Sequence, residues 1–130
     1  MKKRIEYTIT SREGTSDRDG LDATIIEAMR LRASYKRIGE IVMQFIPDKG
    51  DARLSNVQVD SEYRGLGVGR AMVEEAESVA KNGGAERLIL KSVPSAIGFY
   101  EKLGFRREIE GSDRMVKYLE EPERDQNDGD

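Results

Sequence analysis

Three glycines alternate with other residues in the segment Arg64-Gly65-Leu66-Gly67-Val68-Gly69, which lies between a predicted strand and a predicted helix. Glycine costs about 0.5–1 kcal/mol per residue in regular structure, so this segment is predicted to be a tight strand-to-helix bend. In such a bend, several backbone N–H groups and the positive end of the helix dipole converge, and no side chain blocks approach. The bend is therefore predicted to bind an anion.

The spacing of these glycines excludes two common nucleotide-binding loops. A P-loop needs a glycine, four further residues and then Gly-Lys-Ser/Thr, and this run does not occur in the chain. The dinucleotide fingerprint needs a small residue three positions beyond its second glycine, where this chain has Arg70 or Met72. A glycine-rich connector without a ligand is the remaining alternative to an anion site.

The N-terminal third is predicted to hold one strand, one loop and one helix. Alternating apolar residues predict a strand over 5–9, and the polar segment 11–20 is predicted to be a mobile loop. Over 21–29, apolar residues recur with the spacing of one helical stripe, and this helix is expected to be capped by Asp19 or Asp22.

The middle of the chain is predicted to form an antiparallel hairpin. Crowded apolar residues over 38–46 and the turn composition of Pro47–Gly50 lead into a second strand at about 52–60. In that strand Leu54 and Val57 are three residues apart, which places them on opposite faces of a regular pleat. Either both faces are buried, or a bulge lies near Ser55 and Asn56.

The C-terminal half continues with two helices and three strands. Apolar spacing predicts a helix that ends at Gly83-Gly84 and a short helix that opens at Pro94. Strands are predicted at 88–90, about 105–109 and about 114–119.

Charge is unevenly distributed. Residues 120–130 hold six acidic residues and one basic residue, and removing them from the totals of 25 and 22 leaves 19 acidic and 21 basic residues. Residues 1–119 are therefore predicted to form one nearly neutral domain that binds neither nucleic acid nor membrane, and 120–130 to be a disordered acidic tail. The chain has no cysteine and no histidine, so no thiol nucleophile, imidazole triad or zinc site is predicted, although a carboxylate-only metal site stays open.

A second motif, Ser95-Ala96-Ile97-Gly98-Phe99-Tyr100-Glu101-Lys102-Leu103-Gly104-Phe105, follows the glycine loop by about 30 residues. The two segments resemble the signatures of the GNAT family of N-acetyltransferases: a pyrophosphate loop of the form Gln/Arg-x-x-Gly-x-Gly/Ala, and a helix that ends in Phe-Tyr-x-x-x-Gly-Phe. The likeness is close from about residue 53 to residue 107. Outside that span, only the order of the predicted elements agrees with the family.

The resemblance implies an α/β (α+β) fold, with a mixed, mostly antiparallel sheet of about six to seven strands and about three helices. It also implies an enzyme that transfers an acetyl group from acetyl-CoA (coenzyme A) to a primary amine. A cytoplasmic location is expected because the sequence shows no run of 18 apolar residues and no signal-peptide pattern. Direct attack of the amine is expected, because there is no cysteine to form a thioester on the enzyme. The alternative is a non-catalytic protein of the same fold that binds acyl-CoA as a sensor or serves as an interaction module.

The resemblance assigns roles to residues at both motifs. The predicted cofactor-binding residues are Val57, Gln58 and Val59 on the strand, Arg64, Gly65, Leu66, Gly67, Val68, Gly69 and Arg70 in the loop, and Ser95, Phe99 and Tyr100 in the second motif. Tyr100 is also the predicted general acid for the departing thiolate, with Phe99 as the neighbouring aromatic anchor. An ordinary core role is the alternative for Tyr100.

Two departures from the family pattern affect the expected chemistry. Many relatives place a glutamate on the strand before the glycine loop, whereas Leu54–Val57 contains no carboxylate. Glu40 on the facing strand is the candidate base, and a water held by Ser55 or Asn56 is the alternative. Val93 stands where many relatives have asparagine, which removes one expected hydrogen bond to the cofactor.

The acceptor side is expected, by resemblance, to involve the loop 11–20 and the first helix. Their acidic residues Glu13, Asp17, Asp19 and Asp22 would attract a cationic amine, or they are simply solvated. A protein amino terminus, a lysine, a polyamine and an antibiotic all stay open as acceptors, and apolar edges of the last two strands would allow a homodimer.

Overall fold

The computed structural model describes residues 6–32 and 35–119, so the predicted acidic tail 120–130 lies outside the described residues. The strands are β1 (Tyr7–Thr15), β2 (Asp22–Arg30), β3 (Lys36–Ile46), β4 (Asp51–Val59), β5 (Arg87–Lys91), β6 (Arg106–Arg107) and β7 (Arg114–Tyr118). The helices are α1 (Val68–Asn82) and α2 (Ile97–Lys102), and the short 3-10 helices are η1 (Pro47–Lys49), η2 (Ser61–Tyr63) and η3 (Pro94–Ala96).

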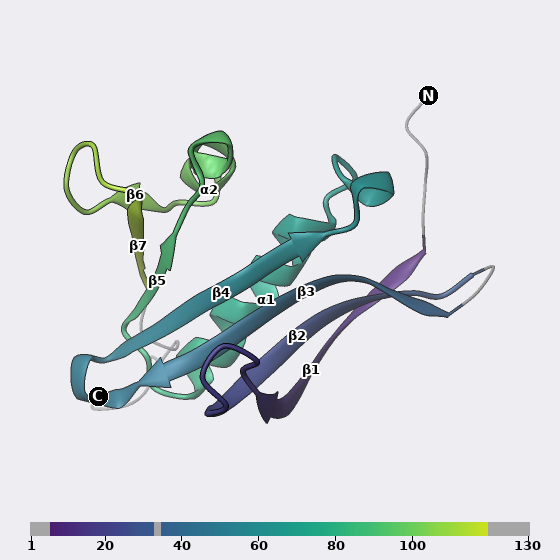
Figure 1. Cartoon of the computed structure of the whole chain (residues 1–130), viewed down its shortest axis with the longest axis horizontal. Helices are drawn as coiled ribbons and strands as arrows, with labels where there is room; N and C mark the ends of the chain where they lie inside the picture. Colours follow the sequence, from purple (N-terminus) through teal and green to yellow (C-terminus); the bar gives the residue numbers. More distant parts are fainter. Residues whose placement is uncertain (1–5, 33–34, 120–130) are drawn as a thin grey trace, which may run out of the picture. The chain divides into compact units, whose positions relative to one another are not determined.

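The strands form one seven-stranded sheet in the order β1-β2-β3-β4-β5-β7-β6 (Figure 1). The pairings β1–β2, β2–β3, β5–β7 and β6–β7 are antiparallel, which confirms the expected fold class. The described residues contain two α-helices where about three were expected. By its contacts the described part of the chain divides into two compact units, one of residues 6–32, 35–44 and 53–76 and the other of residues 45–52 and 77–119.

The first unit is the meander β1–β4 with the first half of α1 packed on one face. Ile26, Ile41 and Met72 are fully buried in its core. A Cβ added at Gly39 on β3 would lie 2.8 Å from the Cε of Met72 on α1, so position 39 faces the helix. Because side chains alternate along a strand, Glu40 and Val42 face the opposite side of the sheet.

The prediction of a loop followed by a helix before residue 30 is wrong. Strand β1 continues to Thr15, and residues 22–30 pair in register with both β1 and β3 as strand β2. Asp19 is no helix cap, because its Oδ1 accepts a hydrogen bond of 2.9 Å from the Leu21 N–H in the short β1–β2 connection. Between β1 and β3, apolar side chains on both faces of β2 are covered, and this removes the alternation that marks a half-buried strand.

Strand β4 carries the predicted irregularity. Asn56 has a φ of +54°, the left-handed conformation that asparagine tolerates better than most residues. Ala52 and Leu54 are buried before Asn56, whereas Val57 and Val59 are the more covered side chains after it. The inward positions therefore change from even to odd numbers at Asn56, which explains the spacing of Leu54 and Val57.

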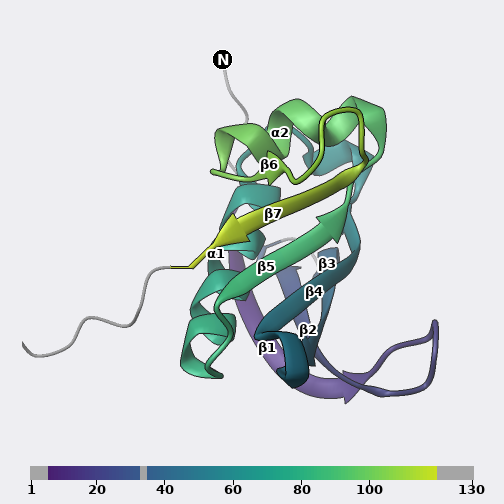
Figure 2. The ribbon, with the colours of Figure 1, turned by 90° about the vertical axis from the view of Figure 1, so that its left-hand side faces the viewer.

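The second unit contains the pairings β5–β7 and β7–β6, with β7 in the middle, and helix α2 (Figure 2). The predicted strand at 88–90 and the helix opening at Pro94 are confirmed, while the predicted strand at 105–109 is reduced to Arg106–Arg107. Helix α1 ends where the two glycines predicted its end, and Gly84 adopts a φ of +88°. Neither α-helix of the described chain combines the length and the apolar character needed to cross a bilayer.

Replacing Gly39 with alanine is expected to lower the free energy of unfolding by about 1–3 kcal/mol. The new Cβ would lie 2.8 Å from the Met72 Cε and 3.1 Å from the Gln58 carbonyl oxygen, so the fully buried Met72 side chain and the backbone of β4 would both have to shift. Urea denaturation measures the effect. Gly98→Ala is the control, because a Cβ at that helical position meets no atom within 4 Å. Equal stability of the two variants would contradict this packing.

Candidate functional site

The glycine loop joins β4 to α1 in the first unit. Gly65 and Gly67 have φ angles of +77° and +87°, and an added Cβ at either position meets nothing within 4 Å. Glycine is therefore required here for its backbone conformation, and the space beside the loop is open. The Ala71 N–H donates to the Gly67 carbonyl at 3.0 Å, the first bond of the helix. The amides of Val68, Gly69 and Arg70 consequently have no acceptor within the helix and stand at its positive end.

The two predicted loop arginines have protein partners. The Arg64 Nε donates to the Val59 carbonyl at 3.1 Å, which ties this side chain back to the end of β4. The Arg70 Nε lies 3.9 Å from the Glu74 carboxylate on the exposed surface of α1. Surface pairs of this kind contribute little, so Arg70 remains able to exchange Glu74 for an anion. The backbone amides are thus the fixed part of the loop, and the arginines are its adjustable part.

The structure brings the candidate base Glu40 beside the irregularity in β4. The Asn56 Nδ2 donates to the Glu40 Oε2 at 2.9 Å, and the Gln58 Nε2 in turn donates to the Asn56 Oδ1. The Arg37 Nη1 donates to the other carboxylate oxygen of Glu40 at 3.3 Å. Two donors on different strands therefore hold the Glu40 carboxylate in one orientation. The Ser55 hydroxyl instead donates to the Val42 carbonyl at 3.4 Å.

A row of charges extends from Glu40 across the sheet. The Arg37 Nη1 also lies 3.5 Å from the Glu27 carboxylate, and the Arg12 Nε donates to the same carboxylate at 2.9 Å. The hydrogen bond that Arg12 donates to Glu27, followed by the negative charge of Glu27, raises the pKa of Arg12. Arg12, Glu27 and Arg37 were not predicted as site residues. The β2–β3 register places Glu27 opposite Glu40 and so brings these side chains together, whereas a helix over 21–29 has no such register.

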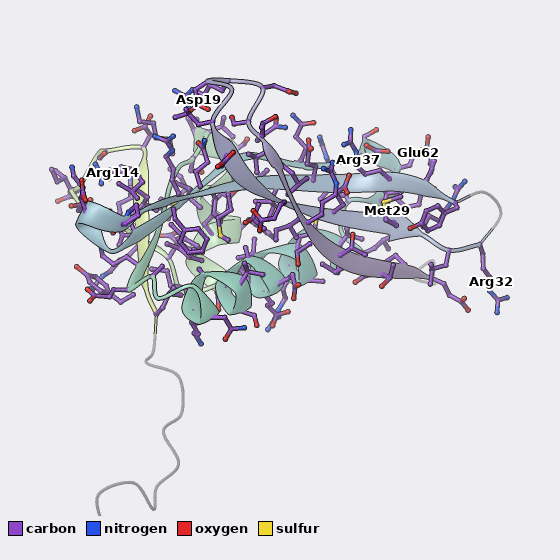
Figure 3. The ribbon with its side chains drawn as sticks, turned by 90° about the horizontal axis from the view of Figure 1, so that it is seen from below. Asp19, Met29, Arg32, Arg37, Glu62 and Arg114 are labelled. Carbon is purple, nitrogen blue, oxygen red and sulfur yellow. The ribbon has the colours of Figure 1, made fainter. Side chains whose placement is uncertain are left out.

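This charged row borders a pocket of about 660 Å³ on the face of the β1–β4 sheet away from α1. In Figure 3, Arg37 and Asp19 lie on this side of the sheet and α1 lies on the other. Ile25 and Val42 supply an apolar floor and are 3% and 7% exposed. The lining residues are Arg12, Gly14, Thr15, Ser16, Asp17, Arg18, Ile25, Arg37, Glu40, Val42, Ser55 and Asn56.

Of the four acidic residues expected near the acceptor, Asp17 lines this pocket. Asp19 accepts hydrogen bonds from the Gln44 amide at 3.2 Å and from the Leu21 N–H, and the Leu21 bond is the main cause that lowers the pKa of Asp19. Glu13 and Asp22 are exposed on β1 and β2. Asp19 therefore holds the β1–β2 connection in place. Of the four acidic residues, only Asp17 lines the pocket.

Tyr100 lies in the second unit, on α2. It is 6% exposed, and its ring packs edge-to-face against Phe99 and Phe105 with centroid distances of 5.1 and 5.6 Å. Burial raises the pKa of the Tyr100 hydroxyl. Phe99 is the aromatic neighbour of Tyr100 that the sequence predicted and is 38% exposed, whereas Phe105, a second aromatic neighbour that was not predicted, is 3% exposed. Ser95 is exposed in η3, which opens α2.

Comparison with known proteins identifies this combination of elements. Residues 15–105 match the sequence profile of the Acetyltransferase (GNAT) family. Glucosamine 6-phosphate N-acetyltransferase of Trypanosoma brucei brucei is 40% identical over 53 residues, which cover 41% of this chain and 36% of that protein. The match therefore spans little more than a third of that relative's length.

Two solved structures share the fold. The PaiA N-acetyltransferase of Thermoplasma acidophilum, in complex with coenzyme A, is 27% identical with a TM-score of 0.64, and the match covers 78% of this chain and 64% of that chain. An acetyltransferase of the GNAT family from Staphylococcus aureus Mu50 is 20% identical with a TM-score of 0.66, and the match covers 75% of this chain and 68% of that chain.

Proposed function

Because the chain belongs to the Acetyltransferase (GNAT) family, we propose that it transfers an acetyl group from acetyl-CoA to a primary amine. The glycine loop is the observation that carries this proposal. Two glycines in the left-handed conformation, with open space beside them, precede a helix whose first amides have no acceptor within the helix. Such amides suit the diphosphate of coenzyme A, since they supply donors and positive potential without a side chain in the way.

In this proposal each part of the chain's first unit has a separate task. The backbone from Gly65 to Arg70 holds the diphosphate, and Arg64 and Arg70 add charge at its edges. The strand Val57–Val59 offers its backbone to the pantetheine arm. Acetyl-CoA supplies the activated thioester, so the protein needs no covalent intermediate. Glu40 accepts the proton that the attacking amine must lose, directly or through a water molecule.

Glu40 is the proposed base because of its surroundings. Its carboxylate is fixed by Asn56 and Arg37 next to the break in β4, and its side chain is 18% exposed, so that it is reachable from the pocket. A lysine-like amine has an ordinary pKa near 10.4 and is mostly protonated at neutral pH, so an acceptor of its proton is needed. Tyr100 and Ser95 are proposed to act on the cofactor from the second unit. Tyr100 donates a proton to the thiolate. Burial raises the pKa of its hydroxyl, which keeps this proton bound at neutral pH and also makes its transfer more costly.

Acetyl-CoA at 100 times its dissociation constant is expected to stabilise the protein by about 2.7 kcal/mol, seen as an upward shift of several degrees in Tm. Gly67→Ala should cut this stabilisation to about 1.4 kcal/mol, corresponding to an affinity about 10-fold lower. The reason is that an alanine in the left-handed conformation costs about 1–2 kcal/mol, and the loop relaxes by turning its amides away.

Gly111→Ala is the matched control for this experiment. Gly111 has a φ of +84° and open space around it, but it lies in the β6–β7 connection. The Gly111→Ala variant should lose as much stability without ligand as the Gly67→Ala variant, and it should keep the full increase in Tm with acetyl-CoA. A Tm that responds to ATP or to a dinucleotide but not to acetyl-CoA would refute the proposed function. If acetyl-CoA binds but no amine causes release of the free coenzyme A thiol, the alternative of an acyl-CoA sensor would be supported instead.

A further inference from the structure

The pocket on the β1–β4 sheet offers more free hydrogen-bond donors than free acceptors. The Arg12 and Arg37 side chains are 56% and 51% exposed. Within residues 6–32 and 35–119, Arg12 bonds only through its Nε and Arg37 only through one Nη. Arg18, a third lining arginine, forms no guanidinium hydrogen bond to the same residues. Each guanidinium carries five N–H donors, so most of them face the pocket or solvent.

The carboxylates that line the pocket are, by contrast, few, and each oxygen of Glu40 can accept only one further hydrogen bond. Both oxygens of the Glu40 carboxylate accept a hydrogen bond, one from Arg37 and one from Asn56. Asp17 is the other lining carboxylate, so three guanidinium groups face two carboxylates. The Glu27 carboxylate, 14% exposed, holds Arg12 and Arg37 in place. The pocket therefore suits a ligand that brings its own acceptor oxygens.

The absence of a side chain at Gly14 leaves room for the Arg12 guanidinium. A Cβ at Gly14 would lie 3.2 Å from the Arg12 Nη1 and 2.9 Å from the Ile25 Cγ1. The guanidinium of Arg12 thus lies over the glycine and beside the apolar floor. Any larger residue at position 14 would displace it.

Both sides of the pocket carry charged side chains. Glu40 and Arg37 come from β3, whereas Arg12 comes from β1, and Asp17 and Arg18 come from the β1–β2 connection. Adjacent strands lie about 4.8 Å apart, so β1 and β3 are separated by about 10 Å. A volume of about 660 Å³ lies in the range of small-molecule sites. One small molecule can therefore reach both sides.

We propose that the acceptor is a small amine that also carries an acidic group, a carboxylate or a phosphate monoester, bound by Arg12 and Arg18 while its amine is directed to Glu40. This inference rests on the proposed function for the identity of the reaction. The binding preference is independent of the proposed function, because it depends only on the residues of the pocket. Guanidinium groups bind both kinds of acid through paired hydrogen bonds.

The test measures binding by titration calorimetry in the presence of coenzyme A, which lacks the acetyl group and so prevents turnover. The probes are two pairs that differ in the acidic group: phosphoethanolamine with ethanolamine, and 4-aminobutyrate with 4-aminobutanamide. In at least one pair, the acidic member is expected to bind about 10-fold or more tightly than its neutral partner. The pair that shows the preference identifies phosphate or carboxylate.

Arg12→Gln and Arg18→Gln are each expected to reduce that preference by about 10-fold and to leave the neutral amine unchanged. Arg32→Gln is the matched control, because Arg32 is an exposed arginine that pairs with Glu6 at the end of the sheet away from Asp19 (Figure 3). Arg18→Gln also separates a loss of binding from a loss of folding, since the Arg18 guanidinium makes no hydrogen bond to the described residues that the variant would break.

Equal binding of acidic and neutral members in both pairs would overturn the inference, as would a preference that persists in both arginine variants. Parallel assays of thiol release with acetyl-CoA report on the proposed function separately. Acidic amines that bind selectively but are never acetylated would refute the proposed function and leave the pocket's preference standing. If only neutral or polycationic amines are acetylated, the proposed function would stand and the preference for acidic amines would be refuted.

Discussion

Replacing Asp51 with alanine is expected to lower the free energy of unfolding by about 2–3 kcal/mol, because it removes a fully buried carboxylate together with both of its hydrogen bonds from Arg87, whose side chain is 22% exposed. The Asp51 side chain is completely buried at the start of β4. Its two oxygens accept hydrogen bonds of 2.7 and 2.9 Å from the Nε and Nη2 of Arg87, the first residue of β5. This bidentate contact, followed by an interaction with Tyr118, raises the pKa of Arg87.

Urea denaturation of Asp51→Ala measures this effect, with Asp48→Ala as the control. Asp48 is an exposed aspartate in the connection between β3 and β4, and no hydrogen bond within the described residues depends on its side chain. Adding Arg87→Leu to Asp51→Ala should recover part of the loss, because it removes the unpaired charge. If Asp51→Ala and Asp48→Ala are equally stable, the buried pair does not stabilise this unit.

The glycine loop and the hairpin before it were predictable because local rules determine them. Left-handed φ angles at Gly65 and Gly67 follow from the need for a tight bend that only glycine forms cheaply. The odd spacing of Leu54 and Val57 predicted either a strand with two buried faces or a bulge near Asn56, and the left-handed φ of Asn56 agrees with the second. In both places the sequence itself contains the constraint.

Strand β2 was not predictable from the same rules. Ala28 and Met29 favour helices, and Leu21, Ile25 and Ala28 happen to have the spacing of one helical face. Pairing with β1 and β3 overrides that preference, since it satisfies the backbone of β2 on both edges and covers both of its faces. Such pairing depends on residues distant in the sequence, which a local pattern does not contain.

The same limitation applies to the pocket. Glu40 could be named as a base from its place on the facing strand, but its partners come from other strands and are fixed by register. Glu27 is opposite Glu40 only because β2 and β3 are antiparallel, and Arg12 approaches Glu27 only because β1 extends beyond residue 9. A strand that ends at residue 9 followed by a helix over 21–29 has no register that would bring these charges together.

Tyr100→Phe is expected to lower kcat by about 10²–10⁴-fold while acetyl-CoA binds as tightly as before. A phenyl ring keeps the packing against Phe99 and Phe105 and removes only the proton that the thiolate would receive. Thiol release measures kcat, and the shift in Tm measures cofactor binding. Tyr35→Phe is the control, because Tyr35 is a 66% exposed tyrosine whose hydroxyl has no proposed role.

The pH profile separates a proton donor from an ordinary core residue. A general acid works while it is protonated, so its contribution is present below its pKa and is lost as the pH rises through that value. The ordinary pKa of tyrosine is near 10 and burial raises that of Tyr100, so this loss should begin only above about pH 10 in the wild-type enzyme. Tyr100→Phe should abolish this alkaline loss of kcat. A variant that retains wild-type kcat, or one that shows the same alkaline loss, would assign Tyr100 to the core alone and leave the thiolate to be protonated by solvent.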